Sequence, residues 1–250
     1  MDEGWTRWLL EDFEFPYTSV MSEAIRAGDL TSEYDVIILP QDDVAMMTGE
    51  FAESGEYQSF SPEDYPEEYR SGFGQEGIAA LEDFVRNGGT LVTFSTAGEL
   101  PMRHFGIPVR NAVEGVATTD FWSPGSTLHI DVDAEHPMAY GMPSRALATF
   151  WQGNQVYETM AGAESAGVER LATYVDRDVL QSGWLIGEEH LAGKAAAVAV
   201  DHGQGQIVML GFRAQHRAQT HGTFKLLFNA LMSPAPAHEA MATDEMGGGS

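Results

Sequence analysis

The stretch Thr90-Leu-Val-Thr-Phe-Ser95 decides the fold class when it is taken with the residues that precede it. Its length and largely apolar character are typical of a strand buried on both faces of a sheet. The run Tyr34-Asp-Val-Ile-Ile-Leu-Pro40 has the same character and ends at a proline. Between the two runs, apolar residues recur at helical spacing over residues 74–87, and the following glycines allow a left-handed cap. Strand, helix and strand in this order predict a parallel crossover unit.

Further elements are predicted on both sides of this unit. An opening helix carries its apolar side chains at three- and four-residue steps, at Trp5, Trp8, Leu9 and Phe13. Strand candidates follow at residues 128–132, 146–151 and 171–175, then a hairpin of residues 194–201 and 206–211, and a closing helix at 222–232. We therefore expect an α/β, flavodoxin-like three-layer sandwich with a mostly parallel central sheet. Because such a domain usually opens with a strand and none precedes the first helix, the first strand is expected to be missing.

The chain is predicted to form one domain over residues 1–232, with residues 110–200 as an embellishment or subdomain of it. Residues 233–250 are dominated by Pro, Ala, Glu and Gly, a composition that predicts a disordered tail. Residues 41–73 are predicted to form a long acidic loop. Loops of this length are uncommon in compact domains and tend to be functional or mobile.

The charge of the chain excludes two classes of partner. Its 38 acidic and 13 basic residues give a net charge of −25. Nucleic-acid binding requires the opposite sign, since phosphate neutralisation supplies most of that affinity, and an anionic membrane would repel this surface. An ordinary solvated acidic surface explains the charge, and adaptation to high salt, where screening relaxes self-repulsion, is the alternative.

Two hydroxyl residues stand where the strand ending at Ser95 turns into a short helical segment at 99–105. A sharp strand-to-helix turn exposes its side chain and can carry a nucleophile, so Ser95 and Thr96 are weak catalytic candidates. Either hydroxyl needs an adjacent base to ionise. The commoner role for a hydroxyl at a helix start is to cap that helix, which is the favoured interpretation.

A second cluster of polar residues follows the last predicted strand, in Gly211-Phe-Arg-Ala-Gln-His-Arg217. His216 is the candidate base, and Arg213, His216 and Arg217 are candidate ligands for a carboxylate or phosphate at the carboxyl edge of the sheet. The favoured alternative is that both arginines pair with acids and close the last helix against the sheet.

The sequence predicts no metal site. Eight histidines are present, but none has Glu three residues later. Asp131, Asp133 and Glu135 offer oxygen ligands for calcium, although solvent-facing acids are the commoner explanation. No glycine-rich phosphate loop is present, and no cofactor is expected.

Three segments together resemble a known family. They are Asp2-Glu-Gly-Trp-Thr-Arg-Trp-Leu-Leu-Glu11 with Phe15-Pro-Tyr17, Gln181-Ser-Gly-Trp-Leu-Ile-Gly187, and Gly211-Phe-Arg213 through His216-Arg-Ala-Gln219 to Gly222–Leu231. In this order they resemble the C-terminal, class I glutamine amidotransferase-like region of bacterial zinc carboxypeptidase (carboxypeptidase A-like) proteins.

The resemblance implies an accessory role more than an activity. In that family the peptidase chemistry and the zinc belong to an upstream domain, which would be this chain's partner, and export to the periplasm or medium is implied. Amidotransferases use a cysteine, and this chain has none; they also place an acid two residues after the catalytic histidine, where this chain has Ala218. We therefore expect a non-catalytic domain for packing, substrate binding or assembly. The alternatives are a free-standing module that binds a sugar or small anion, and a residual hydrolase using Thr96 and His216.

Overall fold

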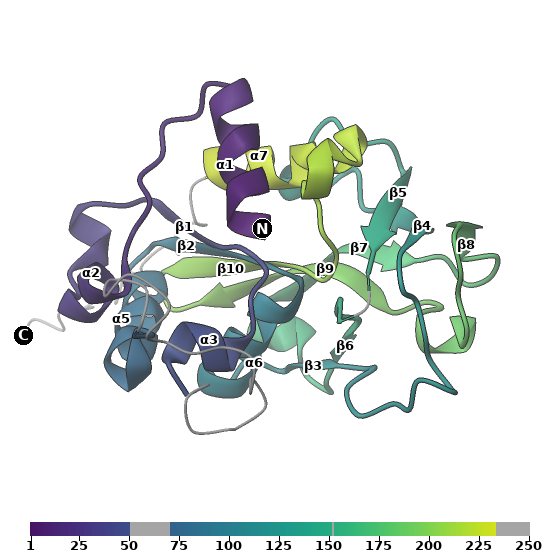
Figure 1. Ribbon diagram of the computed structural model, residues 1–250, viewed down its shortest axis with the longest axis horizontal. Helices are drawn as coiled ribbons and strands as arrows, with labels where there is room; N and C mark the ends of the chain where they lie inside the picture. Colours follow the sequence, from purple (N-terminus) through teal and green to yellow (C-terminus); the bar gives the residue numbers. More distant parts are fainter. Residues whose placement is uncertain (51–70, 152, 234–250) are drawn as a thin grey trace, which may run out of the picture.

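The computed structural model describes residues 1–50, 71–151 and 153–233. Within these ranges the strands form one ten-stranded mixed sheet with the main order β1-β2-β10-β9-β7-β4-β5. Helices cover both faces of its β1-β2-β10 part, α1 and α7 on one side and α2, α3, α5 and α6 on the other (Figure 1). The predicted α/β, flavodoxin-like layered class is confirmed. The predicted tail lies outside the described residues, apart from Ser233.

The predicted helices and strands form near their expected positions, but five short elements were not predicted, at residues 22–27, 44–48, 109–111, 157–159 and 180–182. The helices are α1 (Asp2–Asp12), α2 (Ser22–Ala27), α3 (Val44–Thr48), α5 (Gly74–Arg86), α6 (Glu99–His104) and α7 (Phe224–Met232). The strands are β1 (Val36–Leu39), β2 (Thr90–Phe94), β3 (Val109–Asn111), β4 (Ser126–Val132), β5 (Arg145–Phe150), β6 (Tyr157–Thr159), β7 (Val168–Tyr174), β8 (Leu180–Ser182), β9 (Ala195–His202) and β10 (Gly205–Leu210).

Parallel pairing is confined to three strands. β2 pairs in parallel with β1 on one side and with β10 on the other, with Val92 opposite Ile38 and Val208. All five residues of β2 are buried, as expected for a strand covered on both faces. Val92 contributes to the hydrophobic cluster shared with α7, whereas Leu91 contributes to the cluster shared with α5. This two-sided burial explains why the strand lacks polar alternation.

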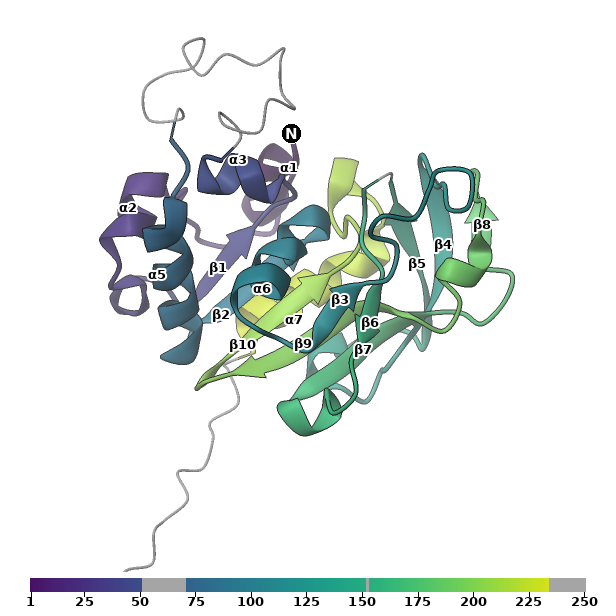
Figure 2. The same ribbon diagram turned by 90° about the horizontal axis from the view of Figure 1, so that it is seen from below.

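The remainder of the sheet is antiparallel. β10 follows β9 through a tight hairpin, which reverses the direction of the sheet, and β7, β4 and β5 continue it with antiparallel pairing. Strands β3 to β9, which lie within residues 109–202, extend the same sheet beyond β10 (Figure 2). The expectation of a mostly parallel sheet is therefore wrong for its second half, which is antiparallel because it is built from hairpins rather than crossovers.

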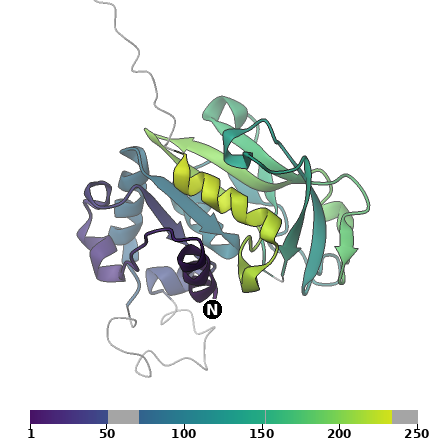
Figure 3. The same ribbon diagram turned by 90° about the horizontal axis from the view of Figure 1, so that it is seen from above.

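The buried side of α1 differs from the predicted one. Trp8 is 40% exposed and Phe13 is 47% exposed, whereas the polar residues Asp2 and Thr6 are buried with Leu9. Phe13 instead packs against α7, with its ring 4.9 Å from that of Phe228. Helices α1 and α7 lie on the same side of the sheet (Figure 3). The spacing of the apolar residues predicted the wrong buried face of α1, because this helix packs polar residues against the loop that follows β10.

The predicted acidic loop of residues 41–73 begins with a short helix, α3, which sequence periodicity did not reveal. Asp43 accepts a hydrogen bond from the Ala45 amide at 2.9 Å and so caps the helix. Gly49 ends it in the left-handed region, with φ of 87°. The remainder of that loop, residues 51–70, lies outside the described residues. None of the helices described is long and apolar enough to cross a membrane.

Candidate functional site

The carboxyl ends of β1, β2 and β10 meet at one edge of the sheet because the three strands run in parallel. β1 leads to Gln41 and Asp42, β2 leads to Thr96, and β10 leads to Arg213. The Arg213 Nε donates to Gln41 Oε1, and the Thr96 hydroxyl donates to the Asp42 carbonyl at 2.8 Å. The candidates predicted after β2 and β10 therefore share this edge, as expected for the ligand-binding edge of an open α/β sheet.

Ser95 occupies the strand-to-helix turn in a constrained conformation. It is fully buried and has φ of 52°, in the left-handed region that side chains other than glycine seldom adopt. Its hydroxyl donates to Asn154 Oδ1 at 2.8 Å. The residue before α6 is Gly98, and no side chain caps that helix. The interpretation of Ser95 or Thr96 as the cap of this helix is therefore wrong, because both hydroxyls are used in long-range contacts.

His216 is buried and faces a carboxylate that sequence spacing did not reveal. Its Nδ1 lies 3.5 Å from Asp2 Oδ1, at the start of α1. Arg213 Nε lies at the same 3.5 Å from that oxygen. Asp2 thus provides the acidic partner that position 218 lacks. It was missed because it is more than two hundred residues away in the chain and was assigned to no face of the helix.

A connection between β5 and β6 reaches into this edge. We call Trp151 and residues 153–156 the β5–β6 connection. The Trp151 ring lies 5.4 Å from the His216 ring, and the Arg213 guanidinium lies 6.0 Å from the same indole. At its other end the connection is hydrogen-bonded to the residue after β10. There the backbone amide of Gln155 donates to the Gly211 carbonyl at 2.7 Å.

The same connection contacts the turn after β2. Asn154 accepts the hydrogen bond from Ser95, and a Cβ added at Gly153 would lie 3.8 Å from the Thr96 methyl group. The connection therefore contacts both the hydroxyl pair and His216. Among the described residues, His216 accepts no hydrogen bond from either hydroxyl, so the structure brings the predicted residues to one edge without forming a nucleophile–base pair.

Several buried polar atoms at this edge have no hydrogen-bond partner among the described residues. They are Asp2 Oδ1, Trp151 Nε1, Gln155 Oε1, Tyr157 Oη, Gln215 Oε1 and His216 Nδ1. Each glutamine uses its amide nitrogen, Gln155 toward Glu99 and Gln215 toward Thr6, both at 2.8 Å, and leaves its oxygen free. Since buried polar groups are almost always paired, this concentration indicates that water or a ligand supplies the missing bonds.

Burial sets the protonation of the charged groups at this edge. Desolvation lowers the pKa of His216 and Arg213 adds to that effect, while Asp2 opposes it, so the imidazole is neutral near pH 7. Desolvation also lowers the pKa of Arg213, against the opposing charge of Asp2. Partial burial raises the pKa of Glu99 although Arg103 counteracts it.

His216 is expected to make the stability of the protein depend on pH. Because its pKa is lowered in the folded state, the unfolded chain binds more protons as the pH falls below about 6.5, and the folded state loses stability in that range. Urea unfolding at a series of pH values should show a smaller loss for His216→Gln than for the wild type. If the free energy of unfolding changed with pH to the same extent in both proteins, the lowered pKa of His216 would be contradicted.

The remaining predicted residues lie apart from this edge or make other contacts. Arg217 is exposed, has φ of 54°, and makes no ion pair with a described residue. Asp131 is paired with Arg145 at 2.9 Å, and Asp133 accepts from the Glu135 amide at 3.2 Å. In the described ranges no three His, Asp or Glu side chains are placed to hold a metal ion.

Comparison with known proteins shows the fold alone. No family model matches the sequence, and no curated protein matches it significantly. A cytoplasmic protein from Salmonella typhimurium superposes with a TM-score of 0.56 at 12% identity, over 92% of this chain and 86% of that one. A protein described as a GMP synthase component, from Thermoplasma acidophilum, gives 0.50 at 10% identity, over 89% and 82%.

A third solved structure has a lower similarity. A protein described as ThuA-like from Bacteroides uniformis gives a TM-score of 0.45 at 15% identity, over 91% of this chain and 80% of that one. The two better superpositions show that the chain has a layered α/β fold. Their identities are too low to transfer an activity.

Proposed function

We propose that this chain is a binding domain for a small polyhydroxy ligand, such as a sugar, at the carboxyl edge of β1, β2 and β10. The single observation that carries the proposal is the concentration of buried polar atoms without partners at that edge, among the residues described. Two of these atoms, on Gln155 and Gln215, are pure acceptors without a charged partner, and a ligand that donates hydrogen bonds would satisfy them.

Charge favours a hydroxylated ligand over an anion at the same edge. Arg213 is already engaged by Asp2 and Gln41, so it offers little to a carboxylate or phosphate. Asp42 interacts electrostatically with Asp2 and adds negative charge there, which repels an anion. Hydroxyl groups donate to carboxylates and amide oxygens, and the half-buried Trp151 provides an aromatic ring for the apolar face of a sugar.

The hydroxyl contacts favour binding over hydrolysis. The hydroxyl hydrogens of Ser95 and Thr96 are donated to Asn154 and to the Asp42 carbonyl, respectively. A serine or threonine nucleophile needs a base within about 2.6–3.2 Å, and no described base accepts from either hydroxyl. With no cysteine in the chain, the thiolate used by amidotransferases has no counterpart.

Replacement of Trp151 by alanine is expected to weaken ligand binding. A panel of neutral monosaccharides and disaccharides would be titrated by calorimetry against the wild type and Trp151→Ala. A bound sugar should lose at least about tenfold in affinity in the variant, which corresponds to about 1.4 kcal/mol. Trp184→Ala is the matched control, since Trp184 is 60% exposed and lies after β8, away from this edge. Binding of inorganic phosphate or acetate, with no sugar bound, would overturn the choice of ligand.

We also propose that the domain serves a larger zinc carboxypeptidase-family protein as a non-catalytic part, which the sequence resemblance implies. The supporting structural observation is that four large apolar side chains on and after α1 are exposed, at Trp8, Phe13, Tyr17 and Met21. Large exposed apolar side chains are a feature of many interfaces. Sequencing the gene upstream of the Met1 codon tests this: an in-frame peptidase domain supports it, and an in-frame stop codon directly before Met1 contradicts it.

A further inference from the structure

A polar cavity lies in the antiparallel half of the sheet, away from the edge described above. It has a volume of about 400 Å³ and is lined by His129, Asp131, Arg145, Val175, Asp176, Arg177 and Asp178. His129 and Asp131 lie on β4, Arg145 lies on β5, and the others belong to the loop between β7 and β8. A cavity of this size falls in the range that holds small ligands.

The loop that closes this cavity is held in place by its backbone. The Glu188 carboxylate accepts hydrogen bonds from the amides of Asp178 and Val179, at 2.8 and 3.1 Å. The Val179 carbonyl in turn accepts from the His129 amide at 2.8 Å. Asp178 adopts the left-handed conformation, with φ of 55°, which aspartate tolerates better than most residues. The charged side chains of the loop are therefore carried by an ordered turn.

The charges that line the cavity are only partly neutralised. Arg145 pairs with Asp131 at 2.9 Å. Arg177 makes no ion pair with any described residue, although acids outnumber bases 38 to 13 in the chain. Asp176 and Asp178, its neighbours in the chain, also line the cavity and form no ion pair in the described part of the chain. His129 adds a buried Nδ1 to which no described residue is hydrogen-bonded.

We propose that this cavity binds a small zwitterion of the α-amino acid class. The carboxylate of the ligand would pair with the Arg177 guanidinium, which offers a planar pair of donors. Its ammonium group would pair with the carboxylates of Asp176 and Asp178, which accept hydrogen bonds only. A ligand with both charges matches the lining, whereas a simple anion meets three aspartates and a simple cation leaves Arg177 unpaired. This site is separate from the proposed sugar site and does not depend on it.

The test is a calorimetric titration of the full chain with glycine, L-alanine and L-lysine. N-acetylglycine, which lacks the ammonium group, and glycinamide, which lacks the carboxylate, should bind at least about tenfold more weakly than glycine. Arg177→Gln and Asp178→Asn should each weaken binding by a similar factor. Arg110→Gln is the control, since Arg110 is an exposed arginine paired with Glu158 outside the cavity.

Three outcomes would overturn the proposal. The first is no heat of binding for any of the three amino acids at about 10 mM, a concentration above a millimolar dissociation constant. The second is that a derivative lacking one charge binds as tightly as glycine. The third is unchanged binding in Arg177→Gln. Arg177 and Asp178 are exposed, so both variants should fold normally, and near-ultraviolet circular dichroism would verify this. Sugar binding in the same samples would report separately on the other site.

Discussion

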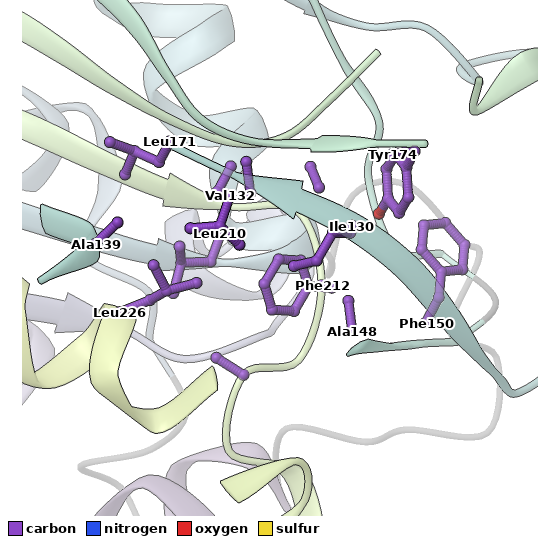
Figure 4. Packing of buried hydrophobic residues seen from close by; sticks show 14 of the residues in the cluster. Ile130, Val132, Ala139, Ala148, Phe150, Leu171, Tyr174, Leu210, Phe212 and Leu226 are labelled. Atoms are coloured by element: carbon purple, nitrogen blue, oxygen red, sulfur yellow. The ribbon is translucent and has the colours of Figure 1, made fainter. Parts of the chain in front are cut away.

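Phe212→Ala is expected to lower the free energy of unfolding by about 3–5 kcal/mol, the usual range for removal of a buried aromatic ring. Phe212 has no exposed surface and belongs to the cluster with Ile130, Ala148 and Leu226, which joins α7 to both halves of the sheet (Figure 4). No single neighbouring side chain can fill the space that the ring leaves, because the cluster is built from several elements. The loss should appear in urea unfolding followed by tryptophan fluorescence.

The control for this substitution is Phe13→Ala. Phe13 is 47% exposed and contacts α7 mainly through ring packing with Phe224 and Phe228. Its removal should cost about 1–2 kcal/mol, the scale of two aromatic contacts. If Phe212→Ala cost no more than Phe13→Ala, the assignment of Phe212 to the central core would be wrong.

Gly211→Ala is the second substitution with a large expected effect, about 3 kcal/mol, at the upper end of the cost of overpacking. A Cβ at this position would lie 2.3 Å from the Gln155 carbonyl oxygen and 3.0 Å from that of Ala196. Both obstacles are backbone atoms, so rotamer changes cannot relieve the clash. The β5–β6 connection would have to move away from β10, and sugar binding should weaken together with stability.

Gly222→Ala provides the matched glycine control. A Cβ there meets no atom within 4 Å, and the residue precedes α7 without a positive φ. The variant should remain within about 0.5 kcal/mol of the wild type, as for most surface substitutions. Equal stability of the Gly211 and Gly222 variants would show that the connection does not lie against β10 as described.

The crossover unit could be predicted from the sequence because its signals are local. Strands β1 and β2 are short apolar runs, and α5 carries its buried residues at helical spacing before a glycine cap. The antiparallel direction of the strands in the second half of the sheet was harder to predict from the sequence. Only the β9–β10 hairpin has a sequence signal, and the pairing of β7 with β4 depends on contacts between distant residues.

Half of the candidate site could be predicted in the same way. Thr96, Arg213 and His216 follow strands whose carboxyl ends must meet, so a topological rule placed them at one edge. Asp2 and Trp151 were missed because their roles arise from long-range packing. The sequence does place Asp2 at the start of an amphipathic helix. However, the spacing of the apolar residues predicted that Trp8 and Phe13, and not Asp2, lie on its buried face.

The hydrolysis of an activated ester is the most direct measurement of the central claim, which is that this edge binds a ligand and does not supply a nucleophile. The rates with p-nitrophenyl acetate would be compared for the wild type, Ser95→Ala, Thr96→Ala and His216→Ala. We predict the same background rate for all four proteins, since both hydroxyls donate to other groups than His216. A loss of about tenfold or more in His216→Ala and in either hydroxyl variant, the size expected for a lost base or nucleophile, would contradict it.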